Sequence, residues 1–127
     1  MNETQFETAL NLKCDARYDY FLKKVADWGE LWILVNEDQQ FLKLFSEEDQ
    51  IEYVPVWPHA DFASDYAKNT DDTLLAKKIS LEVFFDRWIP GLQRDELQLS
   101  VFPNADDTVW IIDIEDFQED LEAALSR

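Results

Sequence analysis

The sequence contains few of the residues that disulfides, metal centres and phosphate-binding loops require. Its 127 residues include one cysteine, one histidine and two glycines. The single thiol, Cys14, excludes an internal disulfide and is typical of a reducing compartment. A zinc site needs several Cys or His ligands, and two isolated glycines cannot build a dinucleotide-binding loop. We therefore expect no metal and no cofactor.

Basic residues are also scarce. Lys and Arg number 11 against 28 Asp and Glu, which gives a formal net charge of −17. Nucleic acids and anionic membranes are bound through clustered Lys and Arg, so direct contact with either is disfavoured. The charge either keeps the protein soluble and monomeric or attracts a basic protein partner.

Long apolar runs are missing as well. No stretch approaches the ~20 apolar residues of a membrane-spanning helix. The residues Met1-Asn2-Glu3-Thr4 begin without the basic and apolar regions of a signal peptide. These features predict a cytoplasmic protein.

Aromatic and aliphatic residues are abundant, with nine Phe, five Trp and four Tyr among 46% hydrophobic residues. This content is enough for a core without disulfide or metal staples. The length predicts a single domain, 1–127, with an N-terminal helical segment at 4–28 and an α+β body at 29–127. Most rings are expected in the core, but a surface patch of rings would favour a partner or a homodimer.

The residues 53–62, Tyr-Val-Pro-Val-Trp-Pro-His-Ala-Asp-Phe, form the central stretch of the chain. They predict a buried strand that stops at Pro58 and turns into a helix. Pro58 suits the first turn of that helix, where its missing N–H costs nothing. The helix has an apolar stripe of Phe62, Ala63, Tyr66 and Ala67.

Two helices are expected before this stretch. Thr4 and Glu7 have capping-box spacing, which predicts a helix from about Gln5 to Leu12. A second helix is expected to have Asp15 as its N-cap and to end at Gly29. Its apolar stripe comprises Tyr18, Phe21, Leu22, Val25 and Trp28. One long bent helix is the alternative, because neither Pro nor Gly separates the segments.

Two further helices are expected in the C-terminal half. Ser80 is the expected N-cap of a helix, and Pro90 should kink or end that helix near Trp88. Asp113 is the expected N-cap of the last helix, whose buried stripe comprises Ile114, Phe117, Leu121, Ala124 and Leu125.

Short apolar or alternating runs predict the strands. The runs lie at 30–35, 41–45, 51–57, 75–79, 97–101 and 109–112. The first three are expected to form a meander, and the last two a hairpin. The order predicts an α+β fold: a single mixed, mostly antiparallel sheet of five to six strands with four to five helices packed on it.

Five residues are candidates for binding: Arg17, Tyr18, Tyr53, Trp57 and His59. His59 either contacts a ligand in a cleft with Tyr53 and Trp57, or bonds to the backbone of its turn and packs on Trp57. Arg17, beside Tyr18, either binds an anionic group or forms a structural ion pair.

Catalytic patterns are not found in the sequence. Cys14 has only His59 as a possible base, and neither has a motif around it. The pairs Asp71-Asp72 and Asp106-Asp107 lack the spacing of a calcium loop and are typical of solvated turns. We expect that the protein is not an enzyme.

Several motifs occur in an order that resembles a known family. They are Arg17-Tyr18, Phe21, Lys23-Lys24-Val25-Ala26-Asp27, Trp32, Pro55-Val56-Trp57-Pro58-His59, Phe62-Ala63, Ile79-Ser80-Leu81, Phe84, Pro90-Gly91-Leu92 and Val101-Phe102-Pro103. Over roughly 17–125 the chain resembles the bacterial family known as domain of unknown function 2750. The resemblance implies a small bacterial cytoplasmic protein and assigns no functional residues.

The leading hypothesis is a non-catalytic protein-interaction domain, with binding or inhibitor- or immunity-like action, whose acidic surface meets a basic partner. The alternative is a small-ligand-binding or enzymatic domain that uses a cleft near 53–62. Self-association through an aromatic patch is a third hypothesis.

Overall fold

The computed structural model describes residues 3–48, 50–71, 73–103 and 110–126. Five helical segments lie in this part of the chain: α1 (Glu3–Leu10), α2 (Cys14–Trp28), α3 (Ala60–Thr70), the continuous run of α4 (Leu81–Val83), η1 (Phe84–Trp88) and α5 (Ile89–Arg94), and α6 (Ile114–Leu125). Six strands accompany them: β1 (Glu30–Val35), β2 (Leu44–Ser46), β3 (Ile51–Val56), β4 (Leu75–Ser80), β5 (Gln98–Val101) and β6 (Trp110–Ile112).

The strands form two sheets, so the predicted single sheet is wrong. One sheet has the order β2-β3-β5-β6, in which β3 and β5 are parallel and the other neighbours antiparallel. The other sheet is the antiparallel pair of β1 and β4. The predicted α+β class and the β5–β6 hairpin are confirmed.

In the predicted meander over 30–57, the antiparallel pairing of the second and third strands is confirmed, but the pairing of the first and second is wrong for a local reason. The Asn36 side chain accepts hydrogen bonds from the amides of Asp38 and Gln40, at 2.9 and 3.0 Å, and closes a turn. After this turn only Phe41 forms a bridge back to β1, at Val35. The chain then leaves β1, and β2 pairs with β3 instead. β4 pairs with β1 along its full length, on the edge opposite to Phe41 and Trp57.

The two sheets meet at one backbone pair. The amide of Trp32 donates to the Trp57 carbonyl at 2.8 Å, and the amide of Trp57 donates to the Trp32 carbonyl at 2.9 Å. Pro58 follows and has no N–H to continue the ladder. The predicted end of pairing at Pro58 is confirmed.

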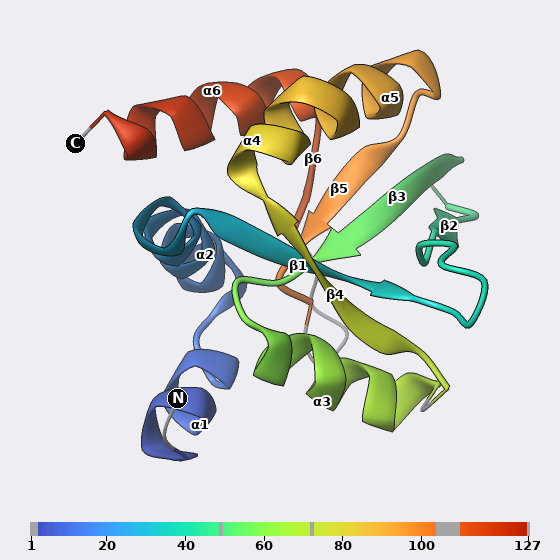
Figure 1. The fold of residues 1–127 in the computed structure, drawn as a ribbon. Coiled ribbons are helices and arrows are strands. Elements are labelled where there is room, and N and C mark those ends of the chain that lie inside the picture. The colour runs from blue at the N-terminus through green and yellow to red at the C-terminus, as the bar shows by residue number, and fades with distance from the viewer. Residues whose placement is uncertain (1–2, 49, 72, 104–109, 127) are drawn as a thin grey trace.

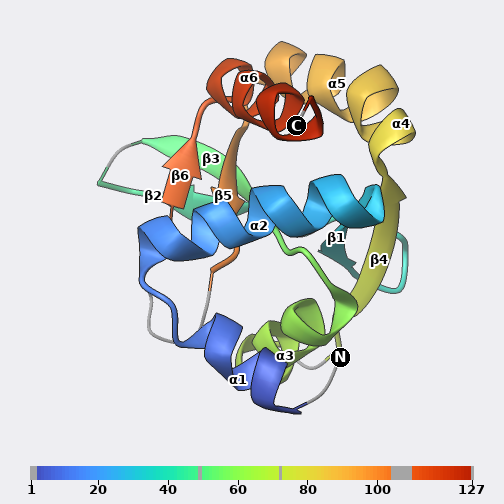
Figure 2. The same ribbon diagram turned by 90° about the vertical axis from the view of Figure 1, so that its left-hand side faces the viewer.

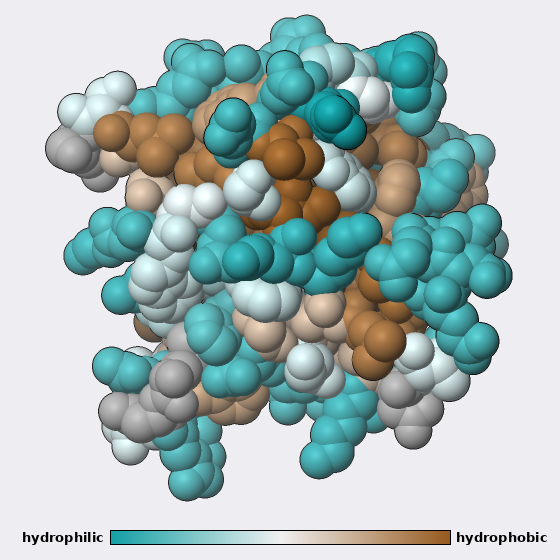
Figure 3. Space-filling view, viewed as in Figure 1, coloured by the Kyte–Doolittle hydropathy of each residue, from teal (hydrophilic) through white to brown (hydrophobic). Residues whose placement is uncertain are grey.

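The helices surround the sheets (Figure 1). The α4–η1–α5 run and α6 lie at the top of the view, and α3 lies at the bottom. Figure 2 shows α2 crossing between these two groups, with α1 beside α3. Hydrophilic side chains cover most of the face shown in Figure 3, and apolar side chains reach the surface in the gaps between them.

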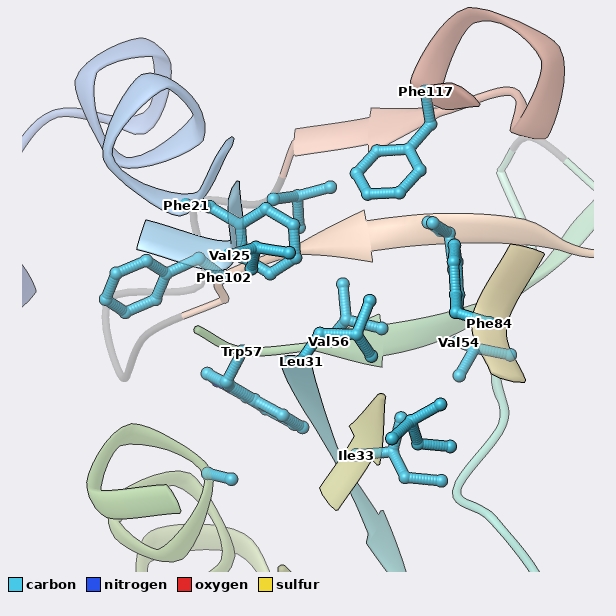
Figure 4. Close-up of a cluster of buried hydrophobic side chains, with 14 of the residues drawn as sticks. Phe21, Val25, Leu31, Ile33, Val54, Val56, Trp57, Phe84, Phe102 and Phe117 are labelled. Carbon is cyan, nitrogen blue, oxygen red and sulfur yellow. The ribbon is translucent and has the colours of Figure 1, made fainter. Parts of the chain in front are cut away.

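Aliphatic and aromatic side chains from distant parts of the chain form the core (Figure 4). The Phe117 ring lies 5.8 Å from that of Phe21 and 5.9 Å from that of Phe84, centroid to centroid. These contacts join α6, α2 and η1. Two residues predicted to be buried are not, because Trp28 and Leu125 are 41% and 42% exposed.

The N-terminal helices differ from the predicted ones at their starts. Helix α1 already includes Glu3, so Thr4 lies within the helix and the predicted capping box is wrong. Helix α2 has Lys13 as its N-cap, which leaves Asp15 in the first turn rather than at the cap. The break between the helices exposes the Leu12 carbonyl, which accepts a hydrogen bond from the Arg17 side chain at 2.8 Å. That bond favours two helices over one bent helix.

The helix through Pro90 continues to Arg94, so of the two predicted outcomes, a kink or an end near Trp88, the end is wrong. A π-helical turn, η1, precedes the proline, and the Ile89 amide bonds to the Phe84 carbonyl five residues earlier. Pro90 has no N–H to donate, and its ring would clash with the carbonyl four residues before it in an α-helix. The wider π turn changes the spacing there and lets the helix continue.

Two glycines make a matched test of backbone conformation. Gly29 ends α2 with φ 71°, and a Cβ added there would meet nothing within 4 Å. Gly29→Ala should therefore lower the free energy of unfolding by about 1 kcal/mol through backbone strain alone. Gly91 lies inside α5, where a Cβ would meet only Arg94 Nη2 at 4.0 Å. Gly91→Ala should raise the free energy by about 0.5–1 kcal/mol in urea unfolding. Shifts of the same sign for both variants would contradict this assignment.

Candidate functional site

A cavity of about 720 Å³ lies between α1, α2, the start of β1 and the N-terminus of α3. Its inner wall carries rings and charges from three elements: Tyr20, Lys24, Trp28, Glu30, Trp32 and His59. Helix α1 and the residues after it supply the opposite wall: Thr4, Gln5, Thr8, Ala9 and Leu12. The volume is that of a site for a small molecule.

Local structure explains why these side chains converge. Tyr20, Lys24 and Trp28 are spaced four residues apart and therefore share one face of α2. The left-handed Gly29 turns the chain directly from α2 into β1. Along β1, Glu30 alternates with the buried Leu31 and so points to the side away from it.

His59 is placed at the cavity wall by its role as the N-cap of α3. Its Nδ1 accepts a hydrogen bond from the Asp61 amide at 3.1 Å. The neutral ring therefore carries its proton on Nε2, which can donate to a ligand. The helix begins after this cap, so the prediction that Pro58 lies in its first turn is wrong.

The cavity wall already contains a cation–π contact. The Lys24 ammonium lies 5.7 Å from the ring centroid of Tyr20 and 5.6 Å from that of Trp28. The His59 ring meets Trp28 edge to face, with centroids 5.5 Å apart. These rings present an apolar, electron-rich wall that favours flat or cationic groups.

Glu30 contributes the polar group of most interest. Its Oε2 is buried and has no hydrogen-bond partner among the described residues. A buried polar atom without a partner costs free energy, because it has lost water and gained nothing in return. A ligand that donates a hydrogen bond to this atom would recover part of that cost.

Two of the five predicted site residues are held by other parts of the protein. Arg17 is only 2% exposed, and its Nε donates to the Phe102 carbonyl at 3.1 Å. The Tyr18 hydroxyl donates to Asp120 Oδ2 at 2.5 Å, and its ring stacks on Trp110. Neither residue lines the cavity.

The predicted cleft of Tyr53, Trp57 and His59 does not form. Trp57 is fully buried, and its Nε1 donates to the Pro103 carbonyl at 3.1 Å. Tyr53 is half-buried in β3, opposite Leu44 and Gln98. Of the five candidates, His59 alone lines the cavity, and it packs on Trp28 and Trp32.

None of the other inner-wall residues is among the five site residues predicted from the sequence. The sequence predicts Trp28 on the core stripe of α2 and Glu30 only as the start of a strand. The signal was a second helical face formed by Tyr20, Lys24 and Trp28, followed by a charged residue at the exposed position of a buried strand.

In the described part, no three His, Cys, Asp or Glu side chains are arranged to hold a metal ion. Asp72 and the pair Asp106-Asp107 lie outside the described residues. None of the helices in the described ranges has the length and apolar character to cross a membrane.

The Tyr18–Asp120 pair predicts a pH dependence of stability. The pKa of Tyr18 is raised, first by burial and then by its hydrogen bond to Asp120. Burial also raises the pKa of Tyr20. The unfolded chain therefore loses these protons at a lower pH than the folded protein, from about pH 10. The stability is fully present below this pH and falls as the pH rises above it.

Urea unfolding of wild type and Tyr18→Phe between about pH 8 and 11 checks this expectation. The free energy of unfolding of the wild type should fall more steeply above about pH 10 than that of Tyr18→Phe. Parallel curves would show that Tyr18 does not carry the effect.

The similarity of this chain to known proteins covers the inner wall of the cavity but not α1. No curated protein matches the sequence. A family model described as "Protein of unknown function (DUF2750)" matches residues 18–121. The match contains every inner-wall residue from Tyr20 to His59 but leaves out α1. Because it spans most of the 127 residues, the chain belongs to the DUF2750 family.

Proposed function

We propose that the protein is a non-catalytic binding protein that holds a small molecule in the cavity between α1, α2 and β1. One observation carries the proposal: a hollow of about 720 Å³ is lined by the rings of Tyr20, Trp28 and Trp32 together with Glu30, whose buried Oε2 has no hydrogen-bond partner in the described structure. Apolar walls with a few convergent polar groups are the usual composition of ligand sites. The single thiol and the acidic composition favour a cytoplasmic location.

A screen of small aromatic fragments by NMR tests the proposal. Binding fragments should shift the amide signals of the inner wall, those of Trp28, Glu30 and His59 included. Trp28→Ala should abolish these shifts, because it removes a 41% exposed ring from the wall. Phe45→Ala, which removes a 54% exposed ring outside the wall, is the matched control and should leave them unchanged. Shifts that map elsewhere, or no shifts at all, would overturn the proposal.

A groove between α2 and α6 supports a second candidate, the binding of a basic protein partner. This groove, of about 680 Å³, is lined by three carboxylates, one cation and four apolar side chains: Asp19, Asp27, Asp120, Lys23, Leu22, Ala26, Ala123 and Ala124. The Asp120 carboxylate already accepts from the Tyr18 hydroxyl. A lining that is mainly acidic and apolar fits a basic amphipathic helix. The net charge of −17 would also speed the approach of such a partner.

A Lys-rich amphipathic peptide serves as the probe for this second function. It should bind at low salt, weaken as salt rises, and bind less to the Asp19→Asn, Asp27→Asn double variant. The control is Asp38→Asn, Asp95→Asn, which removes two exposed charges outside the groove. Equal loss in both double variants would attribute binding to overall charge, not to the groove.

A further inference from the structure

We infer that the ligand of the cavity is an organic cation, with a flat apolar body and an amine, amidine or guanidine group that pairs with Glu30. This inference rests on the proposed small-molecule function and adds the chemical class of the ligand. It comes from the joint position of one carboxylate and three aromatic rings.

Glu30 provides the negative charge that a cationic ligand would need. Its buried Oε2 has no hydrogen-bond partner in the described structure. Lys24 is the cation on the same wall, but the described salt bridges do not join it to Glu30. Its ammonium lies over Tyr20 and Trp28 instead. Glu30 also lines the cavity, so a rotation of its side chain can turn this oxygen toward a positively charged N–H donor, which forms a stronger hydrogen bond than a neutral donor.

The aromatic wall of the cavity also favours a cation. Lys24 shows that these rings hold a cation in the protein's own structure, at 5.7 Å from Tyr20 and 5.6 Å from Trp28. Its side chain is long and flexible and can move away from the ring faces, which a ligand would then contact. The charged end of the ligand would then meet Glu30, and its apolar body would contact Trp28 and Trp32.

The net charge of the protein favours a cationic ligand as well. A chain with a net charge of −17 draws cations toward its surface and repels anions. An anionic ligand would have Lys24 and His59 as partners, but it would also lie against the unpaired carboxylate of Glu30. A neutral ligand would satisfy the carboxylate only with a weaker hydrogen bond.

Three probes of nearly the same shape separate these classes: benzamidinium, benzamide and benzoate. Calorimetric titration should show that benzamidinium binds the wild-type protein about 10- to 100-fold more tightly than benzamide, and that benzoate binds least. Glu30→Gln should reduce the affinity for benzamidinium by a similar factor and leave that for benzamide unchanged. Glu82→Gln removes an exposed carboxylate from α4 and is the matched control.

Each other outcome overturns the inference. Equal affinity for benzamide and benzamidinium, both lost in Trp28→Ala, would leave the proposed function standing and remove the cation. A preference for benzoate would make Lys24 the charged partner. An equal effect of Glu82→Gln and Glu30→Gln would assign the preference to net charge. If none of the probes binds, the cationic class fails, and the fragment map alone decides the proposed function.

Discussion

Trp57→Ala should lower the free energy of unfolding by about 3–5 kcal/mol, the usual cost of removing a large core side chain. Trp57 is fully buried, and its ring lies 5.1 Å from that of Tyr66. Its loss would leave a cavity at the point where the two sheets meet. The Pro103 carbonyl would also lose the N–H that it accepts at 3.1 Å.

Two variants place this effect at the buried indole. Trp57→Phe keeps most of the ring volume but removes the N–H donor, so it should cost less, about 1–3 kcal/mol. Trp28→Ala removes the same side chain from a 41% exposed position and should cost below about 1 kcal/mol. Urea unfolding followed by far-UV circular dichroism avoids the loss of the fluorophore. An equal cost for the Ala variants of both tryptophans would show that the sheet junction does not depend on this ring.

Arg17→Met should lower the free energy of unfolding by about 2–4 kcal/mol, because methionine fills similar space without donors. The guanidinium, 2% exposed, donates to the carbonyls of Phe102 and Leu12 at 3.1 and 2.8 Å. It thus ties the end of β5 to the break between α1 and α2. Each buried carbonyl left without a donor costs about 1–3 kcal/mol.

The controls for Arg17 use the geometry of the guanidinium. Arg17→Lys keeps the charge but has no planar fork, so it should recover only part of the lost stability. Arg94→Met removes an arginine whose side chain is 78% exposed and should change the free energy by less than about 0.5 kcal/mol. Full stability in Arg17→Lys would mean that charge, not the paired hydrogen bonds, is what the site requires.

Local signals in the sequence were enough for most individual elements. Gly29 ends α2 in the left-handed conformation, and the Ser80 hydroxyl accepts from the Val83 amide, both as predicted. Partner choice between strands could not be predicted in the same way. It depends on the Asn36 turn, which carries the chain off β1 after a single bridge at Phe41.

For the candidate site, too, the local features could be predicted from the sequence and the long-range contacts could not. His59 was identified because a lone histidine at a strand-to-helix corner is visible in the sequence. Its neighbours Tyr20 and Trp28 come from α2, which is distant from it in the sequence, and residues of α1 also line the cavity. Their meeting depends on how α2 packs against β1, which residue spacing does not encode.

The parallel pairing of β3 and β5 has a consequence for synthesis on the ribosome. In the sequence, α3, β4 and the α4–η1–α5 run separate β3 from β5. The pairing of these two strands therefore closes a long loop. A nascent chain that has emerged only as far as α5 has no partner for the Val54–Val56 edge. During that interval the growing chain exposes an apolar strand edge, the kind of surface that chaperones cover.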